Sequence, residues 1–365
     1  MRVAGVVAIV AAGLASVGVC NPAAGEEYAW HLPPGFPRPV VPADNPMSAA
    51  KVALGCRLFF EPRLSVTGTY SCSSCHAPQR AFTDGRAKAV GATGVELTRG
   101  AMTLTNVAYS PAYTWASDRV LTLEAQMEQP LFNEHPVEIG LKRDDGALAA
   151  ALAQDRSYAA AFAEAFPEAT APTIGNAIKA IAAFERTLIS GRSAFDRYVF
   201  DDDRNALSAE AKRGMALFYS DRAGCSHCHS GLNFSGPIVH RGVPRATAAF
   251  ANNGTRDPAA GEHDTGLMAV TGQPGDLGRF RVPTLRNVEL TAPYMHDGRF
   301  ATLEQVIAHY ASGGNRDTHV SDNVDPAIRK LELSADDQRA LLAFLRSLTD
   351  EGFISATVVG CETQP

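Results

Sequence analysis

The sequence predicts a mainly α-helical protein built as two domains in series. Apolar residues recur at helical spacing in several segments, most clearly at 174–189, and no segment shows the alternation of a sustained strand. A length of 365 residues suits two domains. Two short cysteine motifs, one in each half of the chain, agree with this division.

Residues 1–24 have the pattern of a secretory signal peptide. Arg2 forms a short positive region, an apolar stretch follows to Val19, and Ala23-Ala24 offers a cleavage site. The alternative is an uncleaved anchor, because the stretch has about the length of a short membrane span. We predict export to the periplasm and a mature chain without a membrane span.

The predicted N-terminal domain, residues 25–171, begins with a proline-rich extended arm. Ser48 can then cap a helix over 49–60 that Pro62 stops. Further along, the sequence predicts an irregular loop at 83–105, a short helix at 121–129 ended by Pro130, and one or two alanine-rich helices at 147–166.

The predicted C-terminal domain, residues 172–365, opens with the amphipathic helix at 174–189. Glycine and polar residues at 240–280 predict a long loop. The remaining predicted helices cover 207–219, 302–311 and 334–348.

Each half carries one C-x-x-C-H motif, at Cys72, Cys75 and His76 and again at Cys225, Cys228 and His229. Such a motif attaches a c-type haem: the cysteines form thioethers to the porphyrin and the histidine ligates the iron. A redox dithiol or half of a zinc site is the alternative. Zinc would need four ligands around one tetrahedron, whereas these motifs lie far apart and each has its own histidine. We therefore predict two covalent haem c groups.

The formal net charge of -6 argues against nucleic acid as a partner. Seven cysteines less the four haem cysteines leave Cys20, Cys56 and Cys361, of which Cys20 departs with the signal. In an exported chain the two remaining thiols are predicted to form a disulfide.

With the motifs placed, the chain resembles the bacterial di-haem cytochrome c peroxidase and MauG superfamily. The resemblance rests on 58–65 (LFFEPRLS), 81–85 (AFTDG) and 283–298 (PTLRNVELTAPYMHDG). Within it, 106–115 (NVAYSPAYTW) and 134–140 (EHPVEIG) look most like MbnH-type enzymes, which are associated with a periplasmic copper-binding partner.

The resemblance implies two cytochrome c-like domains, each built around one haem. The haem on His76 would be the peroxide site with an open distal face, and the haem on His229 would be six-coordinate. Hydrogen peroxide would form a high-valent di-haem state that oxidises a tryptophan, to kynurenine, on a periplasmic and copper-binding partner. The alternatives are a detoxifying peroxidase supplied by a small cytochrome or cupredoxin, and a simple electron-transfer protein.

Two positions distinguish the classical peroxidases of the superfamily from its MauG-like enzymes. The classical peroxidases have a blocking histidine in the loop after the first haem, and that place falls on Ala92 here. The sixth ligand of the second haem, a methionine in those peroxidases, falls on Tyr310, as in MauG-like enzymes. A phenolate favours a more oxidised iron than a thioether does. A packing role for Tyr310 is the alternative, and the rival ligands are Met295, Met268 and His309.

The resemblance also assigns a distal pocket and an electron relay. Gln126 and Glu138 would line the open face of the first haem, with Pro130 crowding it and Glu138 carrying a proton between the peroxide oxygens. Trp115 would relay electrons between the haems. The plainer interpretations are a surface glutamate and a core tryptophan.

Two further contacts follow from the resemblance. A calcium ion would lie between the domains on the backbone oxygens of Thr291 and Pro293, weakened because its asparagine ligand is replaced by Gly100. Arg286 would bind a haem propionate or, equally, form an ordinary structural salt bridge.

Overall fold

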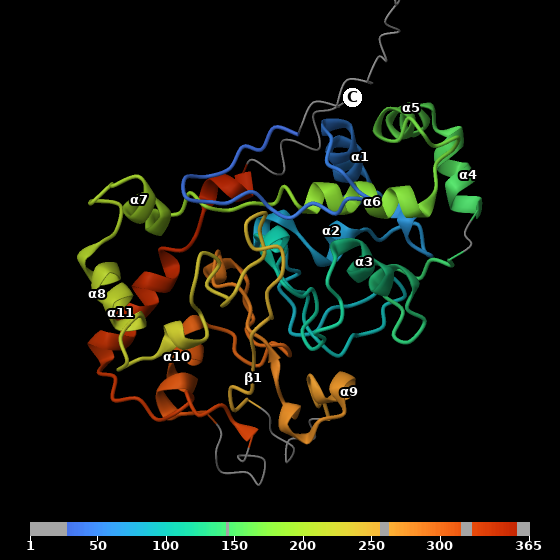
Figure 1. The fold of residues 1–365 in the computed structure, drawn as a ribbon. Helices are drawn as coiled ribbons and strands as arrows, with labels where there is room; N and C mark the ends of the chain where they lie inside the picture. Colours follow the sequence, from blue (N-terminus) through green and yellow to red (C-terminus); the bar gives the residue numbers. More distant parts are fainter. Residues whose placement is uncertain (1–27, 144–145, 256–262, 315–322, 356–365) are drawn as a thin grey trace, which may run out of the picture.

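The protein is mainly helical, as predicted (Figure 1). The computed structural model describes residues 28–143, 146–255, 263–314 and 323–355, so the predicted signal peptide lies outside the described residues. The helices are α1 (Ala49–Phe59), α2 (Cys72–Cys75), α3 (Leu123–Phe132), α4 (Gly146–Gln154), α5 (Arg156–Ala165), α6 (Ile174–Glu185), α7 (Ala194–Phe200), α8 (Ala209–Phe218), α9 (Met268–Thr271), α10 (Leu303–Ser312) and α11 (Ala335–Arg346). Two short strands, β1 (Phe250–Ala251) and β2 (Phe280–Arg281), pair antiparallel.

Hydroxyl side chains set where most of the long helices begin. Each accepts a hydrogen bond from a backbone N–H of the first turn, which would otherwise have no partner. The capping residues are Ser48, Thr122, Thr173, Ser208, Thr302 and Ser334. These starts confirm the helices predicted near residues 49, 121, 174, 207, 302 and 334.

Several elements differ from the sequence expectation. Helix α9 and strand β1 lie within 240–280, the segment predicted as a long loop. Helix α3 continues through Pro130 to Phe132. The proline removes one helical hydrogen bond, but the next turn is still closed because Asn133 N donates to Gln129 O. Helix α6 ends at Glu185, four residues earlier than expected, and α7 is an additional helix started by Ser193.

The described core forms two clusters. The first brings α1, α3, α4, α5 and α6 together around Phe59 and Ile181, and the second joins α7, α8, α10 and α11 around Phe344. Helix α6 therefore packs with the N-terminal half, and the second cluster begins at Phe195. The first cluster also includes Phe353 from near the C-terminus, which packs on Phe82. The predicted limits 25–171 and 172–365 therefore stay a prediction for the folding units.

Each cluster contains one close helix crossing with a glycine at the contact. A Cβ on Gly55 of α1 would lie 1.9 Å from Ala180 O of α6, and one on Gly214 of α8 would lie 1.8 Å from Ala340 O of α11. Both distances are far below van der Waals contact with a backbone atom. The two halves thus use the same device to bring a helix pair together.

Cys56 is disulfide-bonded, whereas the four motif cysteines are free. The predicted partner, Cys361, lies outside the described residues, so the pairing itself stays a prediction. In the part of the chain that the structure describes, no helix combines the length and apolar character that crossing a bilayer requires.

The crossing glycines give a stability prediction. Gly55→Ala and Gly214→Ala should each lower the free energy of unfolding by about 1–3 kcal/mol, because the added methyl group forces the paired helices apart. Gly175→Ala is the control: its Cβ meets only Thr173 Oγ1 at 3.9 Å. Denaturant midpoints of the three variants check this, and equal behaviour of all three would contradict the assigned contacts.

Candidate haem centres

The first haem motif forms a short helix that ends on its histidine. Helix α2 spans Cys72–Cys75, and Ser71 and Ser74 close a capping box at its start. The Nδ1 atom of His76 lies 2.9 Å from Phe82 O. With Nδ1 donating to a carbonyl, the lone pair of Nε2 is free for a metal ion.

The second motif repeats this arrangement. The Nδ1 atom of His229 lies 2.8 Å from Phe234 O. Both acceptor phenylalanines have a left-handed backbone, with φ of 64° at Phe82 and 49° at Phe234, which few non-glycine residues adopt. Burial lowers the pKa of both histidines, which favours the neutral imidazole that a metal ion needs.

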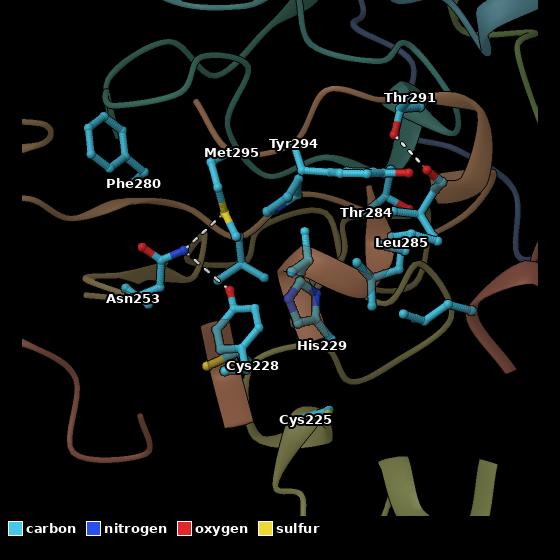
Figure 2. A pocket seen from close by; sticks show the side chains of 18 of the residues that line it. Cys225, Cys228, His229, Asn253, Phe280, Thr284, Leu285, Thr291, Tyr294 and Met295 are labelled. Atoms are coloured by element: carbon cyan, nitrogen blue, oxygen red, sulfur yellow. Dashed lines mark hydrogen bonds between the residues drawn. The ribbon is translucent and has the colours of Figure 1, made fainter. Parts of the chain in front are cut away.

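A cavity of about 260 Å³ opens at the second motif. Cys225, Cys228 and His229 lie on its wall, together with aliphatic side chains from α10 and α11. Figure 2 shows His229 within this space and Asn253 pointing toward Met295. An apolar space beside two free thiols and a correctly oriented imidazole fits a covalently attached porphyrin.

Two of the four candidates for sixth ligand reach this cavity. Tyr310 and Met295 both line it. Burial raises the pKa of the Tyr310 phenol to about 12. His309 Nε2 instead lies 2.9 Å from Asn253 O, and neither His309 nor Met268 is part of the cavity wall.

The predicted distal residues of the first centre lie near one another. Ile139 N donates to Pro130 O at 2.9 Å, which joins α3, the helix that also carries Gln126, to the segment with Glu138. Glu138 is near Cys75, on whose thiol its charge acts, although burial has the larger effect. Burial also raises the pKa of the Glu138 carboxyl.

The loop expected to carry a blocking histidine packs against this segment. The amide of Ala92 donates to Glu138 O at 2.6 Å, and a Cβ on Gly91 would lie 2.0 Å from Val137 O. Ala92 has only a methyl side chain, so this position offers no ligand to the first iron.

Trp115 lies on the wall of the cavity and connects it to the Gly100 segment. Its Nε1 donates to Gly100 O at 2.8 Å, and Gly100 N donates to His296 O at 2.8 Å. Thr291 and Pro293 line the same cavity. Within the described ranges, no cluster of three or more His, Cys, Asp or Glu could hold a metal ion, so calcium here would depend on backbone oxygens and stays a prediction.

Arg286 forms a buried structural salt bridge, while its Nη2 has no hydrogen-bond partner among the described residues, so the contact with a haem propionate stays a prediction. Its Nη1 donates to both carboxylate oxygens of Asp196 at 2.9 and 3.0 Å, and Nε donates to Leu232 O at 2.8 Å. The guanidinium lies over the rings of Phe36 and Phe234 and is not part of the cavity wall.

Two polar groups near the first motif were not singled out from the sequence. Tyr70 Oη lies 3.2 Å from Cys75 Sγ and also donates to Val90 O. Glu185 is 6 % exposed, and its Oε2 has no hydrogen-bond partner among the residues that the structure describes. Burial, and then the charge of Glu185, raise the pKa of the Cys72 thiol to about 12. No sequence motif marks either residue.

Two C-x-x-C-H turns, each with a carbonyl-oriented histidine, define a protein of the c-type di-haem class. The family model for di-haem cytochrome c peroxidase matches residues 49–204. The chain is 35 % identical to the methylamine utilization protein MauG of Methylorubrum extorquens over 85 % of this chain and 81 % of that one. It is 36 % identical to the cytochrome-c peroxidase IdrP1 of Denitromonas iodatirespirans over 92 % of each.

Among solved structures, a MauG-like protein associated with microbial copper homeostasis is 40 % identical, with a TM-score of 0.84 over 90 % of this chain and 97 % of that one. The di-haem peroxidase BthA of Burkholderia thailandensis is 26 % identical, with a TM-score of 0.68 over 85 % of this chain and 88 % of that one. The chain therefore belongs to the di-haem cytochrome c peroxidase and MauG family of oxidoreductases, whose members carry two c-type haems.

Glu185 gives a prediction on stability and pH. Burial raises the pKa of its carboxyl to about 8 in the folded chain, whereas the unfolded chain ionises near the ordinary value for glutamate. The unfolded state then binds fewer protons, so the free energy of unfolding falls by up to about 1.4 kcal/mol per pH unit as pH rises from about 5 to 8.

Glu185→Gln should remove this fall. Relative to the wild type, the free energy of unfolding of the variant should therefore rise by more than about 1 kcal/mol between pH 5 and pH 8. Urea denaturation at the two pH values checks this, with the exposed Glu164→Gln on α5 as control. A constant difference between Glu185→Gln and the wild type would contradict the assigned burial of a protonated carboxyl.

Proposed function

We propose that this protein uses hydrogen peroxide to oxidise a tryptophan, to kynurenine, on a partner protein in the periplasm. One observation carries the proposal: Tyr310 lines the cavity at the second haem motif, at the place where classical peroxidases of the family have a methionine. A phenolate ligand favours oxidised iron, whereas a thioether favours the reduced state that accepts electrons from a small donor protein. This site is therefore suited to withdrawing electrons from a substrate.

At the first centre, Glu138 is the proposed proton carrier. Its position beside Cys75 and Pro130 places a carboxyl next to the first haem motif, and its raised pKa keeps its proton affinity above that of an exposed glutamate. With haem bound, Ala92 would leave the peroxide-binding side of the first iron open. Pro130 would limit the size of the space there, and Gln126 would offer an amide hydrogen bond. His76 would ligate the iron from the opposite side.

Trp115 is the proposed relay between the centres. When bound, the two haems supply the oxidising equivalents taken from peroxide. Trp115 lies on the cavity wall, and the bond from its Nε1 to Gly100 O fixes the orientation of the indole. An indole is oxidised more readily than most side chains, so an electron can pass through it and the substrate need not enter the molecule.

The product follows from the chemistry of peroxide. Two molecules of hydrogen peroxide add two oxygen atoms to an indole and leave as two waters, which gives N-formylkynurenine. Hydrolysis then releases formate and leaves kynurenine. Each peroxide accepts two electrons from the tryptophan, so no further oxidant is required.

The choice of partner rests on similarity. The 40 % identical MauG-like protein is associated with microbial copper homeostasis, which supports a copper-binding partner for this chain. The signal peptide predicted for this chain supports the periplasm as the place of reaction. We also propose a weak calcium site on the backbone oxygens of Thr291 and Pro293, both of which lie on the cavity wall.

A detoxifying peroxidase is the second candidate. Met295 lies on the same cavity wall as Tyr310, and a methionine ligand would suit electron entry from a small cytochrome or cupredoxin. The similarity to cytochrome-c peroxidase IdrP1 also favours it.

Glu138→Gln should slow the reaction with peroxide by about 10²–10⁴-fold, because the amide cannot take up a proton from the nearer oxygen. In the wild type the rate should fall as pH is lowered through the raised pKa of Glu138, and the variant should lose this dependence. Stopped-flow haem absorption measures both, with the exposed Glu134→Gln as control. An unchanged rate in Glu138→Gln would exclude the assigned role.

Trp115→Phe should slow oxidation of the partner by at least tenfold and leave both haems attached, because phenylalanine is much harder to oxidise. Trp30→Phe is the matched control, since Trp30 is the only other tryptophan and packs on Tyr28, with ring centroids 5.1 Å apart.

The assay mixes the enzyme with a periplasmic copper-binding protein and peroxide, and mass spectrometry of that protein detects the change from tryptophan to kynurenine. An unmodified partner, together with rapid peroxide turnover by a reduced cytochrome, would instead establish the detoxifying peroxidase.

A further inference from the structure

Three of the four candidates for sixth ligand of the second iron contact one residue, Asn253. Tyr310 and Met295 contact its side chain, and His309 contacts its backbone. Figure 2 shows the contact between Asn253 and Met295. We propose that Asn253 is a positioning residue that presents Tyr310 to the second haem and keeps Met295 and His309 from the iron.

The side-chain amide serves two of the three. Asn253 Nδ2 lies 3.2 Å from Tyr310 Oη and 3.2 Å from Met295 Sδ, and its two N–H bonds can serve both. Thr255 Oγ1 donates to Asn253 Oδ1 at 2.8 Å. The sulfur of Met295 can only accept a hydrogen bond, so this contact turns the donating nitrogen toward Met295 and Tyr310 and leaves Oδ1 to accept from Thr255.

The two contacts have opposite consequences. An N–H donor stabilises a phenolate oxygen, because the charged acceptor forms the stronger bond. At Met295 the same donor engages the sulfur and holds the side chain in place, and the left-handed backbone of Met295, with φ of 75°, limits its freedom further. The arrangement favours oxygen over sulfur as the ligand.

The third candidate is held by the main chain. His309 Nε2 donates to Asn253 O at 2.9 Å, so this nitrogen has no free lone pair. His309 immediately precedes Tyr310 on α10, and this bond sets which of the two neighbours faces the cavity. One residue thereby fixes the whole choice.

Asn253 itself is fixed by its neighbours. It lies two residues after the end of β1, and the preceding, buried Asn252 donates to Leu277 O at 3.1 Å and accepts from Gly254 N at 3.0 Å. Asp325 N donates to Asn252 O at 2.9 Å. The amide of Asn253 is therefore oriented before any ligand binds.

The inference rests on haem attachment at Cys225 and Cys228, and it is independent of the partner that is oxidised. Haem staining and mass spectrometry of each variant establish attachment first. A wild type without haem at this motif would overturn the proposed function, whereas an attached haem with unaltered ligation in the variants would overturn the inference alone.

Asn253→Leu removes the donor at nearly constant volume. We expect the single low-spin electron paramagnetic resonance signal of the second haem to split into two populations, one of them methionine-ligated and reduced at a higher potential. Asn323→Leu is the matched control, because the Asn323 amide donates to Pro274 O outside the cavity wall. It should leave signal and potential unchanged.

A second substitution tests the competition directly. Asn253→Leu combined with Met295→Leu should restore a single oxygen-ligated signal, since only Tyr310 remains. Asn253→Asp keeps the size of the side chain and the hydrogen bond from Thr255, but an ionised carboxylate cannot donate to Tyr310. This variant provides the test if Asn253→Leu does not attach haem. Wild-type spectra and potentials in both Asn253 variants would overturn the inference.

Discussion

Both haem centres depend on a hydrogen bond from the motif histidine to the backbone carbonyl of a phenylalanine. In each case the carbonyl belongs to a residue in the left-handed region, a conformation that the surrounding core must hold in place. Phe82 packs on Phe59 with ring centroids 6.0 Å apart, and Phe234 packs on Phe195 at 5.1 Å. The aromatic core of each half therefore orients the imidazole that faces the iron.

The two centres share this proximal arrangement and differ on the opposite side. At the first, the backbone amide of Ala92 donates to the backbone carbonyl of Glu138, whereas the second has a phenol, a thioether and an amide around one cavity. In the function proposed here, the open centre reacts with peroxide and the closed centre stores the oxidising power. Trp115, which lies on the cavity wall, is the proposed relay between them.

The sequence predicted regular features better than individual contacts. Hydroxyl caps and apolar spacing located most of the long helices, because these signals are local, and the C-x-x-C-H motif is local as well. Pro130 inside α3 was not foreseen, because the hydrogen bonds that Pro130 O and Leu131 O accept come from Ile139 and Leu141, outside the helix. The salt bridge of Arg286 could not be assigned a partner either, because Asp196 lies 90 residues away along the chain. No sequence motif marks Asn253. Its contacts with Met295 and with Tyr310 of α10 can be recognised only in the folded chain.

Electron paramagnetic resonance of the resting ferric protein tests the central claim most directly, because it reports the ligands of both irons at once. The account predicts one high-spin, five-coordinate haem at the His76 centre and one low-spin, six-coordinate haem at the His229 centre. Two low-spin signals would contradict it, since the first iron would then carry a sixth ligand that neither Ala92 nor its described neighbours can explain.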